Sequence, residues 1–292
     1  MKQRHQGILL ILCAGLSFSF MTFFVRLSGD LPTMQKTFFR NLLPAVFAAI
    51  SLIRKGEKIR LKKENFLPLA CRCVFGTAGV ICNFYAIDKL NLSDANMLNK
   101  LSPFFAIIFS YFILKEKANK FEWGAVVVAF IGSLFIIKPS FQMEFVYALI
   151  GLLGGLGAGI AYTCVRKLGK QGVKGAVIVF YFSIFSCIVT TPYLIFSYSP
   201  MTLKQLIYLM LAGLGATGGQ FCITAAYTKA PAKDISVFDY FQILFAAMLG
   251  FFFLDQIPDW LSVIGYIIII GSAIFKWWYI KNQESKASLE KK

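Results

Sequence analysis

Ten apolar segments follow one another along the chain, and each is long enough to cross a lipid bilayer. About 20 apolar residues span the hydrocarbon core as a helix, and a helix satisfies its own backbone hydrogen bonds without water. Only 15% of the 292 residues are charged, whereas a soluble domain carries about 25%. The sequence therefore predicts an all-α polytopic membrane protein with ten transmembrane helices. The expected spans are 7–27, 33–53, 66–87, 93–114, 120–138, 145–166, 175–196, 203–227, 232–253 and 259–279.

Most of the 30 Lys and Arg residues lie in alternate connections between these spans. With a cytoplasmic N-terminus, the basic loop 54–65 and the C-terminal end from Lys276 both fall on the cytoplasmic side, as the positive-inside rule requires. We therefore predict a multi-pass protein of the cell (inner or plasma) membrane with both termini in the cytoplasm and a basic cytoplasmic tail at 281–292. Topology and contact with anionic membrane lipid explain the net charge of +16, so it does not indicate nucleic-acid binding.

The two halves of the chain resemble each other when one is shifted by 139 residues along the other. Gly76 and Gly79 then meet Gly215 and Gly218, at the same place in the order of spans. Each half has five spans, and because five is odd, the second half enters the membrane upside down. Inverted repeats of this kind place a substrate site near the bilayer midplane, at the interface between the repeats. The two five-helix repeats are expected at 7–139 and 145–280.

Lys100 and Asp239 are lone charges inside apolar spans, and the same shift of 139 residues relates them. A charge at membrane depth costs a few kcal/mol or more, so it commonly marks a functional site. One interpretation is a structural ion pair. The other is a central cavity in which Lys100 binds a carboxylate or phosphate and Asp239 binds an amine, which suits a zwitterion such as an amino acid. The inverted symmetry would place Lys100 toward the outer side and Asp239 toward the inner side, too staggered for a direct pair, which favours the cavity.

Further polar residues inside the spans are candidates for lining that cavity, although hydrogen bonds between helices would explain them equally well. They are Arg40, Asn83, Asn96, Asn99, Tyr162, Gln220, Tyr240 and Gln242. For Arg40 the alternative is snorkelling to the outer headgroups, and we expect Arg72 to snorkel to the inner surface. Pro103 removes the backbone donor for the carbonyl of Asn99, so it is expected to kink the fourth span beside Lys100.

The sequence contains no pattern that favours a metal site or a cofactor. The only histidine is His5 in the N-terminal tail, and the seven cysteines lie in apolar runs, where thiols commonly act as small apolar residues. Protons are a candidate coupling ion, because a carboxylate such as Asp239 titrates differently in wet and dry surroundings.

Two segments resemble a known family. FYAIDKLNLSDANMLNKLSPFFAIIFSYFILKEK (84–117) and AYTKAPAKDISVFDYFQILFAAMLGFFFLDQ (226–256) are similar to the hallmark stretch of EamA-type members of the drug/metabolite transporter superfamily. The second segment departs from the pattern, because Gln242 replaces the proline found at Pro103 and Asp255 replaces the usual glutamate. The resemblance implies a ten-helix secondary transporter with a central cavity that exports metabolites or amino acids.

The leading interpretation is therefore a secondary active transporter that exports a small polar or amphipathic metabolite by alternating access. An importer and a non-transporting membrane scaffold or receptor are the alternatives. A membrane-embedded enzyme is disfavoured, because an aspartyl protease needs two deep Asp residues and only Asp239 is deep. A serine–histidine protease would need a histidine within a span, and there is none. Substrate, coupling ion and oligomeric state are left open.

Overall fold

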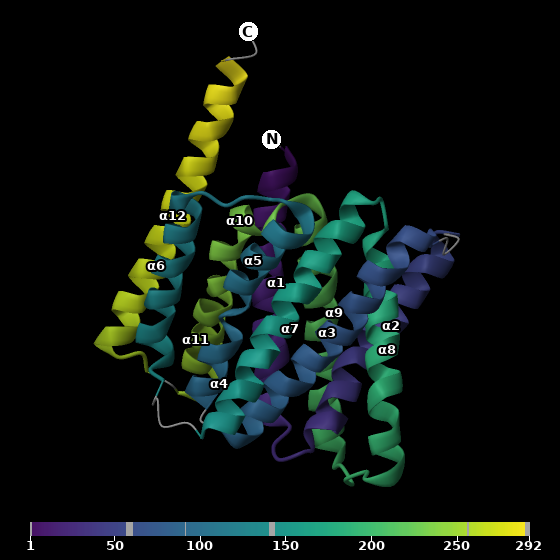
Figure 1. Cartoon of the computed structure of the whole chain (residues 1–292). Coiled ribbons are helices and arrows are strands. Elements are labelled where there is room, and N and C mark those ends of the chain that lie inside the picture. Colours follow the sequence, from purple (N-terminus) through teal and green to yellow (C-terminus); the bar gives the residue numbers. More distant parts are fainter. Residues whose placement is uncertain (1, 57–60, 91, 140–143, 256, 290–292) are drawn as a thin grey trace.

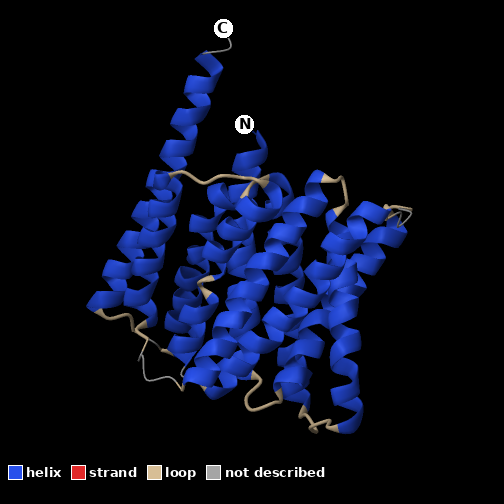
Figure 2. Cartoon of the chain, viewed as in Figure 1, coloured by secondary structure: helices blue, strands red, loops and turns tan. Residues whose placement is uncertain are grey.

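The computed structural model describes residues 2–56, 61–90, 92–139, 144–255 and 257–289, and within these ranges it contains helices and no strand (Figure 2). In the described part of the chain, ten helical segments are long and apolar enough to cross a membrane, as the sequence predicted. The elements are α1 (Lys2–Leu27), α2 (Thr33–Arg54), α3 (Lys63–Lys89), α4 (Leu92–Asn99), α5 (Ser102–Leu114), α6 (Lys120–Ile137), α7 (Phe145–Lys170), α8 (Gly175–Phe196), α9 (Leu203–Lys229), α10 (Ala232–Ile235), η1 (Ser236–Tyr240), α11 (Phe241–Leu254) and α12 (Trp260–Leu289).

Helix lengths differ from the prediction mainly at the C-terminus. The last helix, α12, continues to Leu289, so most of the segment expected as a tail is helical. Residues 57–60 of the expected basic loop and residues 290–292 of the expected tail lie outside the described ranges.

The fourth span of each repeat is interrupted part-way along its length. In the first repeat, α4 ends at Asn99 and α5 begins at Ser102, with Pro103 in its first turn. Proline is favoured in that turn because the amide it lacks would have no helical partner there. In the second repeat, where Gln242 replaces the proline, the chain passes through the 3₁₀ segment η1 between α10 and α11. The predicted spans 93–114 and 232–253 are therefore present, each with an interruption, and the distortion expected beside Lys100 is present.

The packing of the helices follows the inverted repeat (Figure 1). α1 packs on α9 as α7 packs on α3, and α1 packs on α11 as α7 packs on α5. α2 packs on α8, and α6 packs on α12 at one edge of the molecule. Exchanging the two repeats maps each of these pairs onto another pair or onto itself. Both chain ends emerge on one side of the bundle, which we call the terminal face, and the connection from α1 to α2 lies on the opposite face.

Glycines allow the two equivalent helix crossings to come close. A Cβ atom at Gly157 of α7 would lie 2.7 Å from the carbonyl oxygen of Phe75 in α3. At the symmetry-related crossing, a Cβ atom at Gly215 of α9 would lie 2.8 Å from the amide nitrogen of Met21 in α1. Small residues promote this backbone approach in membranes, where helices gain little from hiding apolar surface from lipid. The crossings bring the polar faces of α3 and α9 toward the centre of the bundle.

Replacing Gly157 with alanine should destabilise the protein by about 1–3 kcal/mol, because the new methyl group overlaps backbone and the helices must move apart. Gly271→Ala is the matched control, since Gly271 lies in α12 with no atom within 4 Å of an added Cβ. The control should be neutral or slightly stabilising, because alanine favours a helix more than glycine does. Thermal unfolding in detergent measures both, and equal melting temperatures would contradict the proposed role of the close crossing.

Candidate functional site

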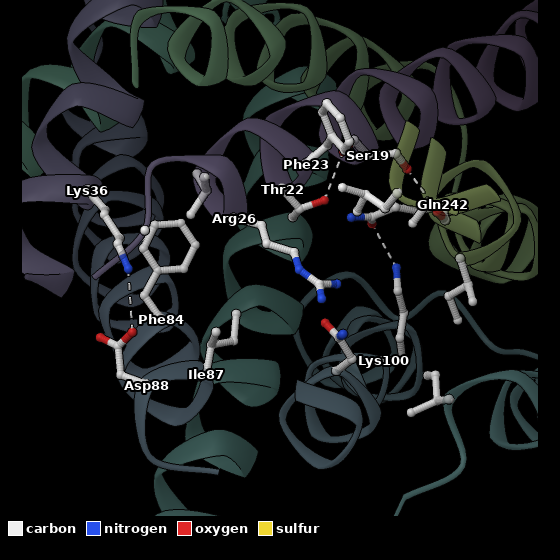
Figure 3. A pocket seen from close by; sticks show the side chains of 18 of the residues that line it. Ser19, Thr22, Phe23, Arg26, Lys36, Phe84, Ile87, Asp88, Lys100 and Gln242 are labelled. Carbon is white, nitrogen blue, oxygen red and sulfur yellow. Dashed lines mark hydrogen bonds and ion pairs between the residues drawn. The ribbon is translucent and has the colours of Figure 1, made fainter. Parts of the chain in front are cut away.

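A cavity of about 500 Å³, the wide cavity (Figure 3), lies toward the opposite face, because Gly29 and Asp30 of the connection from α1 to α2 line it. Its mouth is lined by Arg26 at the end of α1, Asp30 in the connection to α2, Lys36 of α2 and Asp88 at the end of α3. Figure 3 shows the Arg26 side chain directed into the cavity, while Lys36 and Asp88 pair with each other at 3.7 Å. The cavity extends inward between α1, α3, α4 and α11 as far as Lys100.

A second cavity of about 120 Å³, the deep cavity, continues toward the centre of the bundle. Its polar lining comes from both repeats. It consists of Arg40 and Arg72, Asn83, Asn96 and Asn99, Lys100, Tyr162, Gln220 and Gln242, with Thr22. Asn96, Lys100 and Gln242 line the wide cavity as well, so the two cavities adjoin at Lys100.

Lys100 lies in the gap between α4 and α5 and its side chain is buried. Its Nζ atom donates to Gln242 Oε1 at 2.8 Å and lies 3.4 Å from Asp239 Oδ2, within ion-pair distance. Its carbonyl oxygen accepts a hydrogen bond of 3.0 Å from the hydroxyl of Tyr240. The helix interruption therefore leaves a backbone acceptor that the other repeat satisfies, as an apolar environment requires.

The expectation that Lys100 and Asp239 are too staggered to pair directly was wrong. It rested on the inverted symmetry and on an α-helical rise of about 1.5 Å per residue. Asp239 lies instead in η1, and a 3₁₀ helix rises about 2.0 Å per residue. The long lysine side chain spans the remaining distance to the carboxylate.

Most of the candidate residues meet at the two cavities, but two do not. Asp239 and Tyr240 are not among the described residues that line either cavity. The carboxylate of Asp239 contacts the Lys100 ammonium, and the hydroxyl of Tyr240 donates to the Lys100 carbonyl oxygen. Tyr162 lines the deep cavity and stacks on Tyr227, with ring centroids 4.8 Å apart. No group of three His, Cys, Asp or Glu residues in the described ranges could hold a metal ion.

We expected Arg72 to snorkel to the inner surface, and this prediction was wrong. Only 2% of the residue is exposed. Its guanidinium carbon lies 3.9 Å from the ring centroid of Phe182, and its Nη2 atom donates to Gln220 Oε1 at 3.0 Å. The signal that could have located it is glycine spacing. Gly76 lies one turn further along the same face, and a Cβ atom there would overlap the Arg72 guanidinium, so the glycine makes room for the buried arginine.

Arg40 is also buried, with 5% exposed, and does not reach the headgroup region by snorkelling. Its Nη1 atom donates to Asn41 Oδ1 at 2.8 Å. Asn41 in turn donates to Ser186 of α8, which ties the arginine to the packing between α2 and α8. The two arginines thus approach the deep cavity from different helices of the first repeat.

Ion pairs between the repeats join helices at the terminal face. Arg4 at the start of α1 pairs with Asp234 of α10 at 3.0 Å. Glu116, just after α5, pairs with Arg166 of α7 at 3.1 Å and with Lys170 at 2.6 Å. Each pair joins a residue of the first repeat to one of the second. We call these contacts the terminal-face ion pairs.

Glu122 adds to these contacts and also fixes the start of α6. Its side chain accepts from the backbone of Asn119 at 2.7 Å, while Asn119 caps the Glu122 amide, which together form a capping box. The same carboxylate lies 3.7 Å from Lys233 of α10 and 3.6 Å from Lys276 of α12. One side chain therefore holds a helix start and two elements of the other repeat at the terminal face.

A ten-helix bundle of inverted repeats, with interrupted helices around a central polar cavity, is the architecture of a membrane transporter. The model of the EamA-like transporter family matches the two halves separately, at residues 5–138 and 145–277, and the chain belongs to this family.

Relatives support this assignment, and a solved structure shares the fold. The pseudopaline exporter CntI of Pseudomonas aeruginosa (strain UCBPP-PA14) is 32% identical over 271 residues, covering 92% of this chain and 94% of the exporter. The S-adenosylmethionine uptake transporter of Rickettsia bellii is 24% identical over 255 residues, covering 85% of each chain. A protein crystal structure with 13% identity has the same fold, with a TM-score of 0.77 over 91% of this chain and 96% of its own.

Neutralising Asp239 alone as Asp239→Asn should cost about 3–5 kcal/mol, because it leaves the Lys100 ammonium buried without its counter-charge. Adding Lys100→Met should recover most of that loss. The matched control is Lys36→Met with Asp88→Asn, a more exposed pair that should contribute less than about 1 kcal/mol. Unfolding in detergent measures this double-mutant cycle, and additive losses at Lys100 and Asp239 would refute a buried ion pair.

Proposed function

We propose that this protein is a secondary active transporter that exports a small polar or amphipathic metabolite, such as an amino acid, by alternating access. One observation carries the proposal. A cavity with charged residues at its mouth runs from the opposite face to charged residues at the centre, while ion pairs between the repeats join the helices at the terminal face. A solute that enters this cavity can reach Lys100 and the deep cavity along a continuous path through the protein.

Alternating access then requires the terminal-face ion pairs to break as the mouth of the wide cavity closes. The interruptions in the fourth span of each repeat suit this movement, since Lys100 and Asp239 lie where the helices are already broken. The carbonyl of Lys100 is held by one hydroxyl from the other repeat, so the two halves can shift there with little loss of backbone hydrogen bonding.

The direction and the membrane are part of the proposal. Export is supported by the relative named as an exporter, which is the more similar of the two reported, while the relative named for uptake makes import the alternative. The basic loops favour a cytoplasmic terminal face in the cell membrane. In that orientation the wide cavity opens to the outside.

Cysteine labelling tests this movement in a variant whose seven native cysteines are replaced by serine or alanine. Thr22→Cys reports on the wide cavity, and Ser236→Cys, buried in η1, reports on the terminal side. The Thr22 position should react with a water-soluble maleimide and the Ser236 position should not. Glu116→Gln removes the carboxylate that faces Arg166 and Lys170, so it should lower labelling at Thr22 and raise it at Ser236.

Solute flux into proteoliposomes completes the test. A folded preparation that moves no solute in a broad screen would favour a scaffold or receptor. Flux with unchanged labelling in Glu116→Gln would show that other contacts close the terminal face.

Proton coupling through Asp239 gives a separate prediction. Protonation of Asp239 would release Lys100 from its counter-charge and free the ammonium for the solute. Transport driven by a pH gradient should therefore fall strongly in Asp239→Asn, when flux is normalised to folded protein in the vesicles. Asp88→Asn, a carboxylate at the cavity mouth, is the control and should keep its response to the gradient. Full gradient-driven transport by Asp239→Asn would rule out this coupling.

A further inference from the structure

We infer that Arg40 and Arg72 form an anion site in the deep cavity and that the solute bound there carries more carboxylates than amines. The site itself rests on the structure, and its role in transport rests on the proposed function. A net anion differs from the balanced zwitterion that Lys100 and Asp239 alone would suit.

Neither arginine has an acidic partner among the described residues. The hydrogen-bond partners of both guanidinium groups are neutral amides, Gln220 for Arg72 and Asn41 for Arg40. The Nε atom of each is buried with no hydrogen-bond partner in the described chain. A guanidinium has five N–H donors, so each retains unused donors for a ligand.

The charges around the deep cavity do not balance. No Asp or Glu is among the described residues that line it, whereas Arg40, Arg72 and Lys100 all do. Asp239 balances the charge of Lys100 from outside the cavity lining. The charges of the two arginines are then not balanced by any acidic residue among the described lining. Buried charges are costly unless they are paired, and two like charges at one small cavity repel each other. An anionic solute would offset both effects.

The chemistry of the lining indicates what kind of anion fits. A guanidinium presents a planar pair of donors that matches a carboxylate or a phosphate, with two parallel hydrogen bonds. Asn83 lies on the same cavity, and its buried Oδ1 acceptor has no partner in the described chain, so it suits an amine or hydroxyl of the same solute. A zwitterion with a single carboxylate would leave one arginine uncompensated.

The approach to the site becomes more positive with depth. At the mouth of the wide cavity, Arg26 and Lys36 are balanced by Asp30 and Asp88. Further in, Lys100 is the charged residue that both cavities share, and the arginines follow in the deep cavity. This order attracts an anion inward without a strongly charged entrance.

Binding to the full-length protein in detergent tests the site with L-glutamate and L-glutamine, which have nearly the same shape and differ by one carboxylate. Glutamate should bind at least about tenfold more tightly, since a hydrogen bond to a charged group contributes about 1.5–3 kcal/mol, and 1.4 kcal/mol corresponds to a factor of ten. Glutarate should also bind, and L-lysine should not. Inorganic phosphate is a further arm, because binding of phosphate without glutamate or glutarate would support the anion site and overturn its assignment to carboxylates.

Variants then assign the effect to the two arginines. Arg72→Gln and Arg40→Gln should each lose the preference for glutamate over glutamine, and Arg72→Lys should keep part of it because the charge remains. Arg54→Gln, which removes an exposed charge at the end of α2, should behave as the parent protein. Melting temperatures without ligand identify any variant that fails to fold, and the glutamate–glutamine comparison on the unmutated protein decides the inference in that case.

The outcomes separate this inference from the proposed function. Equal binding of glutamate and glutamine, tighter binding of lysine, or no binding of any anion would overturn the anion site. Flux of neutral or cationic solutes alone would overturn it too, while leaving a transporter. Binding of glutamate or glutarate that depends on Arg72, without flux of any solute, would support the site and overturn the proposed function.

Discussion

The structure depends on one junction at the centre of the bundle, where a broken backbone and a buried charge are satisfied together. Each feature alone is costly in an apolar environment. Lys100 resolves both, because its ammonium contacts Asp239 and Gln242 while Tyr240 caps its carbonyl. All three partners come from the second repeat. The same contacts that make the interruption tolerable therefore hold the two repeats in register.

The glycine crossings explain why this junction can form. Close approach of α3 to α7 and of α1 to α9 draws in the elements that carry the polar lining. Gly76 shows the same principle at the level of one side chain, since its missing Cβ atom accommodates the guanidinium of Arg72. Small residues thus determine which polar groups can be buried, and the cavity is a result of that packing.

Much of this architecture could be predicted from the sequence, because length and apolar content specify a membrane span and repeated glycines reveal the inverted halves. The contact between Lys100 and Asp239 could not be predicted, since it depends on the local rise of η1 and on where α4 ends. Arg72 was misplaced for a related reason. The number of residues between an arginine and the end of its helix does not show whether its side chain reaches the membrane surface. The side chain of Arg72 is instead enclosed beside Gly76 and Phe182. Sequence therefore predicts the order of helices better than the depth of a side chain.

The terminal-face ion pairs have a consequence for the energetics of a transport cycle. They join the two repeats at the terminal face, and under the proposed function they would favour the orientation in which the wide cavity opens away from the chain ends. With the termini in the cytoplasm, an exporter would rest facing the compartment into which it releases its solute. Solute that rebinds from that compartment would compete with the return step, so the breaking of these ion pairs would affect the rate of the cycle.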